Sequence, residues 1–363
     1  MSNIRGNIST YDQSAPILED LSSAVRFGAA YDAPLYSFLE RKGATDKDHK
    51  WIEDSPNVRS TTMNNGGTLS AGATTVTVTS GGLFAEGDVV VVDSEYMRVS
   101  SVNANALTIS RGFGGTTPAS HATNAGVVIL TNAQPENSGP EALATAKAEK
   151  SNYTQIFIRP VDVSRTMQRV RNVTGSELEY QIMKSALEVA LDIERALLRG
   201  KADAGSDSGA RAMQGLDGFL TSEVDNEGGT LTLVEFNSFL RGVWDNGGNP
   251  DVLLCDGLFL SVIHEWNVGS LVVSPSDRIG GVRVTQWVSP FGVFTILPDR
   301  QVATGTCYAL TSSSLALAVL DDVHYQELAR TSDGVHGQVV AEVTLECANE
   351  QFHGREYGVT GSA

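Results

Sequence analysis

The sequence predicts an α+β protein, and three observations support that prediction. One long helix is expected in the middle of the chain, from Thr174 to Gly200. A block rich in Thr, Val, Ser and Gly, from about Gly67 to Leu130, is typical of short strands. Strand and helix patterns then alternate after Leu233, which favours a mixed α/β region in the second half of the chain.

The long helix has clear start and stop signals. Ser176 with Glu179, and Thr174 with Glu177, fit the capping-box spacing. Gly200 suits the position just past a helix end, where a left-handed conformation is common. Apolar residues recur at three- and four-residue steps and spread over more than one face, so most of this helix should be covered. The apolar positions expected to mediate packing and assembly are Leu178, Ile182, Leu187, Leu191 and Leu197.

The Thr- and Val-rich block predicts a separate small β domain. Thr74–Ser80 alternates strictly, Gly87–Val92 is a short buried run, and Val127–Leu130 closes the set. Five short strands about ten residues apart suit a small antiparallel barrel or sandwich. The sequence GFGGTT at Gly112–Thr117 lacks the third glycine of a dinucleotide fingerprint and predicts a hairpin turn instead.

Extended chain flanks this β domain on both sides. Asn152–Val170 carries apolar residues at alternate positions, and Pro160 favours an edge strand over a central one. The β domain is therefore expected to be inserted in a long excursion that leaves at Trp51 and returns before Thr174.

Composition and charge restrict the class of function. The chain has 363 residues and a net charge of −17, and Lys201 is its last lysine. This acidity disfavours a nucleic-acid-binding surface, although it is compatible with a shell around DNA. No signal peptide and no apolar stretch of membrane-spanning length is expected. Three widely spaced cysteines suit buried thiols and folding in a cytoplasm; they are Cys255, Cys307 and Cys347.

Catalytic and metal-binding motifs were sought without success. The pair His264-Glu265 begins like a zinc-protease helix, but Val268 stands where the second histidine is required. There is no phosphate-binding loop and no nucleophile elbow. We therefore expect no catalytic residue, no cofactor and no metal.

Several phrases, in their order and spacing, resemble the major capsid proteins of tailed double-stranded-DNA phages, which have the Hong Kong 97-type fold. The resemblance covers the chain from about Ala33 to Gly361. No single phrase is a catalytic signature, so the order of the phrases carries the resemblance. They are APLYSFLERKGA, KWIED, NYTQIFIRPVDVSRT, DIERALLRG, MQGLDGFL and ELARTSDGVHGQVVAEVTLECAN.

The resemblance implies a domain organisation. It comprises an N-terminal arm, an extended E-loop, a peripheral domain built on the long spine helix, and an axial α/β domain. Trp51, Tyr153, Ile156 and Phe157 are expected in the E-loop. The implied ranges are 1–48 for the arm, 49–66 and 131–173 for the E-loop, 67–130 for an inserted β domain, 174–210 and 321–363 for the peripheral domain, and 211–320 for the axial domain.

The resemblance also implies a function without catalysis. Identical subunits would form pentamers and hexamers of an icosahedral or prolate head that encloses the phage genome, made in the bacterial cytoplasm and retained in the virion. Portal, scaffold and decoration proteins are possible further partners, and no membrane is involved. One branch of this fold forms isopeptide crosslinks. Here the candidate residues would be Lys147, Lys150 and Asn349, with Glu346 or Glu350 nearby.

Two other functions were weighed. A bacterial nanocompartment shell shares the fold, but the inserted β domain and the phage-like phrases disfavour it. A soluble α/β enzyme with a β-rich accessory domain would need a polar catalytic cluster, and the sequence contains no recognisable one.

Overall fold

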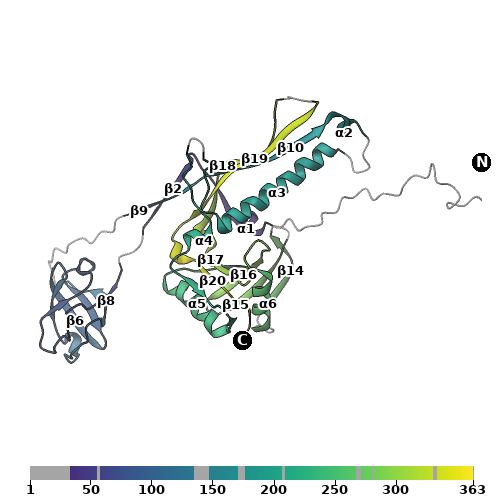
Figure 1. Ribbon diagram of the computed structural model, residues 1–363. Coiled ribbons are helices and arrows are strands. Elements are labelled where there is room, and N and C mark those ends of the chain that lie inside the picture. The colour runs from purple at the N-terminus through teal and green to yellow at the C-terminus, as the bar shows by residue number, and fades with distance from the viewer. Residues whose placement is uncertain are drawn as a thin grey trace, which may run out of the picture. The chain divides into compact units, whose positions relative to one another are not determined.

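The protein was analysed as a computed structural model that describes residues 33–54, 58–134, 147–170, 176–206, 209–266, 271–279, 282–329 and 333–362. The chain divides into two compact units (Figure 1). Unit 1 comprises Met1–Trp51 and Lys150–Ala363, and unit 2 comprises Ile52–Glu149. Each unit is described separately below.

A long helix packed on a four-stranded sheet forms the first half of unit 1 (Figure 1). Helix α3 (Glu177–Arg199) confirms the predicted spine helix. Its sheet has the order β1-β18-β19-β10. The strands are β1 (Glu40–Gly43), β18 (Leu315–Glu327), β19 (Gly334–Cys347) and β10 (Gln155–Ser164), and the short helices α1 (Pro34–Phe38) and α2 (Arg165–Arg169) lie before β1 and after β10.

The ends of α3 differ in detail from the prediction. The Ser176 hydroxyl accepts a hydrogen bond from the Glu179 amide, but the reciprocal bond of a capping box is not formed; Thr174 lies outside the described residues. Gly200 is not left-handed, since its φ is −54°. Glycine is required there by close approach, because a Cβ would lie 2.5 Å from the carbonyl oxygen of Met213.

One face of α3 forms the core of this half. Val189, Ile193 and Leu197 are fully buried and pack with Phe157 and Val161 of β10. Burial of each such side chain contributes roughly 1.5–3 kcal/mol. Strand β10 is the edge strand of the sheet, which confirms the expectation drawn from its proline.

The second half of unit 1 is a seven-stranded mixed sheet with the order β11-β20-β17-β13-β16-β15-β14. Phe236, Phe259 and Trp287 are central to its aromatic core. The strands are β11 (Val224–Asn226), β13 (Val252–Cys255), β14 (Leu271–Ile279), β15 (Val282–Ser289), β16 (Gly292–Pro298), β17 (Cys307–Leu310) and β20 (Gly354–Tyr357), and the helices are α4 (Leu216–Phe219), α5 (Leu233–Asp245) and α6 (Gly257–Trp266).

Strands β18 and β19 lie beside α3, as the sequence predicts for this region, but the short strands that follow them do not. Strand β20 pairs with β17 and β11 inside the seven-stranded sheet. A further pair, β12 (Thr230–Leu231) and β21 (Gly361–Ser362), adds to the same region. The assignment of 321–363 to the peripheral domain is therefore wrong beyond η4 (Glu350–Phe352), because these short strands satisfy their backbone groups in the other sheet.

Unit 2 is an antiparallel sheet of six strands in the order β3-β8-β5-β6-β7-β4. A bridge between Met63 and Val78, with the Asn64 amide bonded to the Thr77 carbonyl, joins the two outer strands and closes the sheet into a barrel. The strands are β3 (Ser60–Thr62), β4 (Thr75–Thr77), β5 (Asp88–Val92), β6 (Glu95–Asn103), β7 (Ala106–Ser110) and β8 (Gly126–Asn132).

The barrel extends beyond the predicted range Gly67–Leu130. Strand β3 pairs with β8, and Met63 is fully buried among the apolar residues of the barrel interior. The hairpin turn predicted at Gly112–Thr117 is wrong, because the strands on either side of it, β7 and β8, do not pair with each other; the segment contains a short 3-10 turn and three glycines at positive φ. The barrel thus has its own core, to which residues before Gly67 contribute.

A buried charged cluster also holds the barrel together. The Arg111 guanidinium makes two 2.7 Å hydrogen bonds to Glu95, and His121 bridges Glu95 and Asp93. The Arg111 hydrogen bond is the main reason why the pKa of Glu95 is lowered to about 2. His121 therefore has a structural role.

Candidate assembly surfaces

A two-stranded ribbon leaves unit 1. It consists of β2 (Asp48–Glu53) and β9 (Ala148–Tyr153), which pair only with each other. Most residues of β9 are exposed, and the exposed fraction of Ile52 in β2 is 69%. An isolated two-stranded ribbon is marginally stable in water, so this ribbon requires support along its length.

The base of the ribbon is fixed by a buried amide. The Asn152 side chain donates to the carbonyl oxygens of Gln214 (3.0 Å) and Leu345 (2.8 Å) and accepts from the Gln214 amide (2.8 Å). Thr154 adds a 2.8 Å backbone bond to Lys47. Because a buried amide group that lost these partners would be costly, the ribbon leaves the body in a defined direction.

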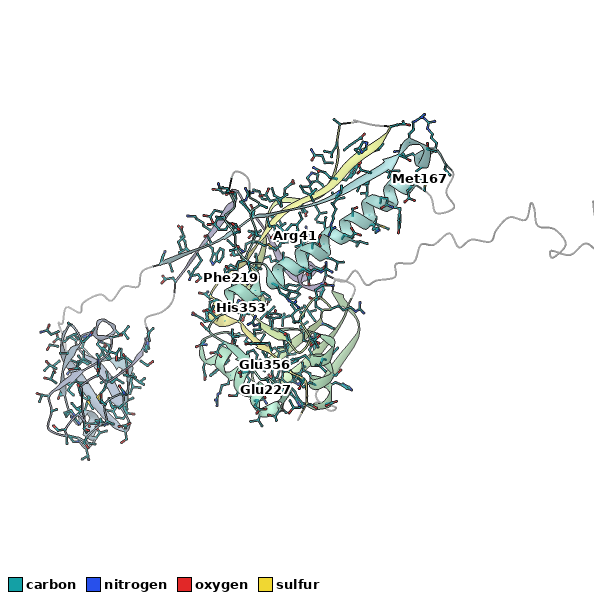
Figure 2. All side chains as sticks on the ribbon, in the orientation of Figure 1. Arg41, Met167, Phe219, Glu227, His353 and Glu356 are labelled. Atoms are coloured by element: carbon teal, nitrogen blue, oxygen red, sulfur yellow. The ribbon has the colours of Figure 1, made fainter. Side chains whose placement is uncertain are left out.

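Trp51 and Glu346 secure the other strand. The Trp51 ring is buried between His49 and Phe219, with ring centroids 6.1 and 6.0 Å away (Figure 2 labels Phe219). Glu346 accepts from Lys42 (2.8 Å) and bonds His49 (2.9 Å). Burial alone would raise the pKa of Glu346, but the bonds and charges of Lys42 and His49 outweigh it and lower the pKa.

The four predicted E-loop residues separate into two groups. Trp51 and Tyr153 lie in the ribbon, in β2 and β9. Ile156 and Phe157 lie in β10, paired with Glu342 and Ala341 of β19, and therefore belong to the four-stranded sheet. Phe157 faces the α3 core, whereas Ile156 lies on the opposite face.

That opposite face of β10 is apolar and exposed. The exposed fractions of Ile156 and Ile158 are 50% and 52%, and these residues alternate with the buried Phe157. Two large aliphatic side chains on one strand face, beside a pocket of about 520 Å³ that includes Arg211, form a surface suited to protein contact.

The predicted spine-helix positions do not share one face. Leu197 is buried in the α3 core, and Leu178 and Ile182 pack against it half-buried. Leu191 is buried outside that core, and Leu187 is only half-buried. Met183, at 50% exposure, continues the half-covered side. The apolar periodicity of the sequence does not distinguish the side of α3 that packs in the core from the half-covered side.

Glu194 is a functional residue that the sequence analysis did not identify. It is fully buried on α3 and accepts from the backbone amides of Leu35 (2.8 Å) and Tyr36 (2.7 Å), which attaches α1 to α3. Burial and the nearby buried Asp299 raise the pKa of Glu194 to about 8. The sequence did contain a signal for Glu194, because an acidic residue stands within an apolar stripe, between Leu191 and Leu198.

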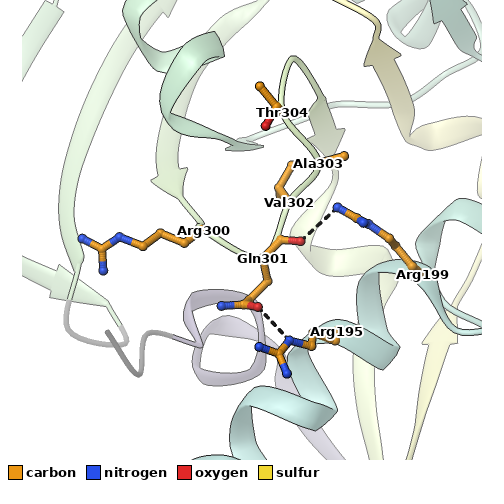
Figure 3. Close-up of a pocket in the computed structure, with 7 residues that line it drawn as sticks. All are labelled: Arg195, Arg199, Arg300, Gln301, Val302, Ala303 and Thr304. Atoms are coloured by element: carbon orange, nitrogen blue, oxygen red, sulfur yellow. Dashed lines mark hydrogen bonds between the residues drawn. The ribbon is translucent and has the colours of Figure 1, made fainter. Parts of the chain in front are cut away.

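An arginine-lined pocket of about 600 Å³ lies at the end of α3 (Figure 3). Arg195 donates to the Gln301 side chain (2.8 Å), and Arg199 donates to the Gln301 carbonyl (3.1 Å). The two guanidinium groups thus attach the loop after β16 to α3, near the negative pole of the helix. Arg300 completes the basic lining.

An acidic cluster lies in the seven-stranded sheet of the same unit. Asp225 and Glu356 are direct neighbours on β11 and β20, and Glu227 is close by (Figure 2 labels Glu227 and Glu356). Glu356 is 1% exposed. Burial is the main reason why the pKa of Glu356 is raised to about 8, and the negative charges of Asp225 and Glu227 raise it further.

The residues suggested for a crosslink lie at separate elements of the chain. Lys147 and Lys150 are exposed at the ribbon, and Asn349 has a left-handed backbone before η4. Glu346 is bonded to Lys42 and His49. Glu350 accepts from Thr221 and Ser222. Both candidate carboxylates are therefore engaged in contacts within the chain.

The described residues contain no group of three or more His, Cys, Asp or Glu side chains arranged to hold a metal ion. Among the helices in the described ranges, none has the length and apolarity needed to cross a membrane.

Solved structures identify the fold of the chain. A structure from Mycobacterium phage Bobi matches with a TM-score of 0.53 and 12% identity, over 97% of this chain and 99% of that one. The capsid of a native GTA particle matches with a TM-score of 0.51 and 7% identity, over 96% and 97%. These matches define the Hong Kong 97-type capsid fold. Among curated proteins, no sequence matches the chain.

The family follows from the sequence itself. The model of the SU10 major capsid protein family matches residues 4–360, and the chain belongs to that family. It is a phage major capsid protein that forms the head shell, and its place is the virion capsid. Its role is structural, with no enzymatic activity. Identical subunits are its assembly partners.

Proposed function

We propose that the ribbon β2–β9 of each subunit lies across a neighbouring copy, and that this contact helps to build pentamers and hexamers of an icosahedral or prolate head. The observation that supports the proposal most strongly is the contrast along β2. Trp51 is buried at the base, whereas the next residue, Ile52, is 69% exposed. A large aliphatic side chain on a ribbon with no strand beside it is suited to a partner's surface.

In this proposal unit 2 is an insertion in the E-loop, whose flanking segments are 49–66 and 131–173. The segment 1–48 is the N-terminal arm, α3 with its sheet is the peripheral domain, and the seven-stranded sheet is the axial domain. The head would enclose double-stranded DNA without sequence-specific contacts, because a chain of net charge −17 has little basic surface for phosphates. Portal, scaffold or decoration proteins would be further partners, and assembly would take place in the host cytoplasm.

Ile52→Asp tests the ribbon contact. We expect particle yield to fall by about tenfold or more, because one charged group in a desolvated contact costs more than ~1.4 kcal/mol. The free subunit should keep its melting temperature, since Ile52 is largely exposed. Ile52→Met is the matched control and should assemble normally. Normal assembly of Ile52→Asp would contradict the ribbon contact, whereas a lowered melting temperature would show that Ile52 supports the subunit itself.

Two deletions test whether unit 2 is an independent insertion. Replacing Val58–Gln134 by a short Gly/Ser linker should leave soluble unit 1, because the complete barrel and its core are removed together. Replacing only Gly67–Leu130 should give insoluble protein, since Met63 and β3 would lose the barrel that buries them. Solubility and circular dichroism are the measurements. If the longer deletion is the insoluble one, unit 2 is required for folding of the body.

A nanocompartment shell is the alternative function. Purified particles that contain a cargo protein and no DNA would support it, and particles that contain phage DNA would support the head.

Denaturing electrophoresis of the same particles decides the crosslink: covalent subunit ladders support an isopeptide between Lys147 or Lys150 and Asn349, whereas a single monomer band excludes it.

A further inference from the structure

Exposed apolar side chains gather on one outer face of the unit 2 barrel. Six large hydrophobic residues in the described part of Ile52–Glu149 are exposed. Four of them occupy neighbouring positions: one lies just before β3, two lie on β8 and one lies on β6. A fifth, Phe113, lies in the turn next to β6. The four are Val58 (58%), Tyr96 (40%), Val128 (40%) and Leu130 (41%).

The strand register places these side chains side by side. Val91 of β5 pairs with both Tyr96 of β6 and Val128 of β8. Ser60 of β3 pairs with Val128, and the Ile129 amide bonds the Arg59 carbonyl, so the same register puts Val58 opposite Leu130. Alternate residues on these strands, such as Val90, Val92 and Val127, are buried inside the barrel. The row Val58, Leu130, Val128, Val91 and Tyr96, here called the barrel patch, therefore lies on the outside.

None of the exposed or half-buried positions of β3, β5, β6 and β8 carries an acidic side chain; the acidic residues of these strands, Asp88 and Glu95, are buried. Arg98 borders the barrel patch, and its guanidinium is held by the Ala133 carbonyl (3.0 Å) across the end of β8. This is notable in a chain with a net charge of −17, because most pairings between two copies of such a chain bring like charges together. Two barrel patches can meet face to face without that repulsion.

The barrel offers little opportunity for another mode of association. The Met63–Val78 bridge joins β3 to β4, so the two outer strands of the sheet, as far as the structure describes them, are closed on each other rather than free to add a partner's strand. An occupant must therefore pack on side chains. A head shell supplies every subunit with identical copies at high local concentration, and a self-complementary face is suited to a two-fold contact between them.

We propose that the barrel patch is an isologous contact between the unit 2 barrels of two copies in the assembled shell. The patch consists of five side chains, whereas a stable interface comprises roughly 20–30 residues a side, so the patch does not sustain a dimer alone. The contact forms when other shell contacts bring two barrels together, and it adds to shell stability by avidity. It requires only that the chain builds a shell, and it is independent of where the ribbon lies.

Cysteine crosslinking of assembled full-chain particles tests this contact. Val128→Cys and Leu130→Cys each place one accessible thiol in the barrel patch, because the native cysteines are buried. Thr108→Cys on β7 is the matched control, exposed on the same barrel but outside the patch. A short bis-maleimide links two thiols. Each thiolate sulfur bonds to one carbon of a maleimide double bond, and the other carbon of that double bond takes up a proton.

The expected result is a covalent dimer of the capsid chain that is several-fold more abundant with Val128→Cys or Leu130→Cys than with Thr108→Cys. The dimer should be absent when the same variants are treated as dilute, unassembled subunits. Equal dimer yields at all three positions, or no dimer in assembled particles, would overturn the proposal. A product that joins the capsid chain to a different polypeptide would also overturn it and would identify that polypeptide as the occupant. If Thr108→Cys assembles but neither patch variant does, the heat stability of Val128→Ala and Thr108→Ala particles is compared instead. Val128→Ala particles with the melting temperature of the wild type would overturn the proposal. Val128→Ala particles that melt at a lower temperature than Thr108→Ala particles would support it.

Discussion

Ile193→Asp is expected to prevent folding of unit 1. Ile193 is fully buried at the centre of the contact between α3 and the four-stranded sheet. A carboxylate at this position loses its hydration and finds no cation, and such substitutions cost several kcal/mol. Domains of this kind are stable by only about 5–15 kcal/mol, so most of the folding free energy of unit 1 would be lost. The measurement is soluble yield together with the urea midpoint of the purified chain.

Leu187→Asp is the matched comparison on the same helix. Leu187 is half-buried and lies outside the α3 core, so the subunit should fold with a urea midpoint close to that of the wild type. We propose that a neighbouring subunit covers this half-buried side of the helix in the shell, so particle formation should nevertheless be lost. A Leu187→Asp subunit that unfolds as readily as Ile193→Asp would show that both sides of α3 are covered within one chain.

Raising the pH from about 5 to about 8 is expected to destabilise unit 1. The pKa of Glu194 is raised from 4.5 to about 8 in the folded chain. Between these values the folded state keeps a proton that the unfolded state has released, so stability falls as the pH rises. The full effect of such a shift is on the order of 5 kcal/mol at about 1.4 kcal/mol per pH unit. Glu356, with its pKa also raised to about 8, acts in the same direction.

The test is the melting temperature of the subunit across this pH range, with Glu194→Gln as the variant. The glutamine amide is neutral, so the variant should lose much of the decline with pH. Its one oxygen replaces only one of the two acceptors used by the Leu35 and Tyr36 amides, so the variant should also be less stable than the wild type at low pH. An unchanged pH dependence in Glu194→Gln would contradict the role assigned to this group.

Unit 2 should respond to pH in the opposite direction. Its Glu95 has a pKa lowered to about 2 by Arg111, so its contribution is complete above pH 4.5 and is lost as the pH falls toward 2. Acid should therefore weaken the barrel, whereas mild alkali should weaken unit 1. This contrast provides an internal reference for the Glu194 experiment.

Local features were predictable from the sequence, and long-range pairings were not. The spine helix is specified by apolar spacing and by Ser176, and both lie within the segment itself. The family resemblance implied an E-loop position for Phe157, but its observed position depends on pairing with Ala341, which is far away in the sequence. Likewise β20 has only four residues, and nothing within them specifies β17 as a partner.

The same reason explains what was missed at the candidate assembly surfaces. The sequence placed Trp51 at the start of the excursion but gave no partner for its ring, which is buried against Phe219. Glu194 could have been suspected from its place among leucines, but its partners Leu35 and Tyr36 lie more than 150 residues earlier. The barrel patch depends on the register of four strands, which the composition of the block does not encode.

Cryo-electron microscopy of particles assembled from the purified chain tests the central claim most directly. The account predicts closed shells in which the β2–β9 ribbon of each subunit packs on an adjacent copy and Ile52 is buried there. A shell in which the ribbon folds back on its own subunit, with Ile52 exposed to solvent, would contradict it.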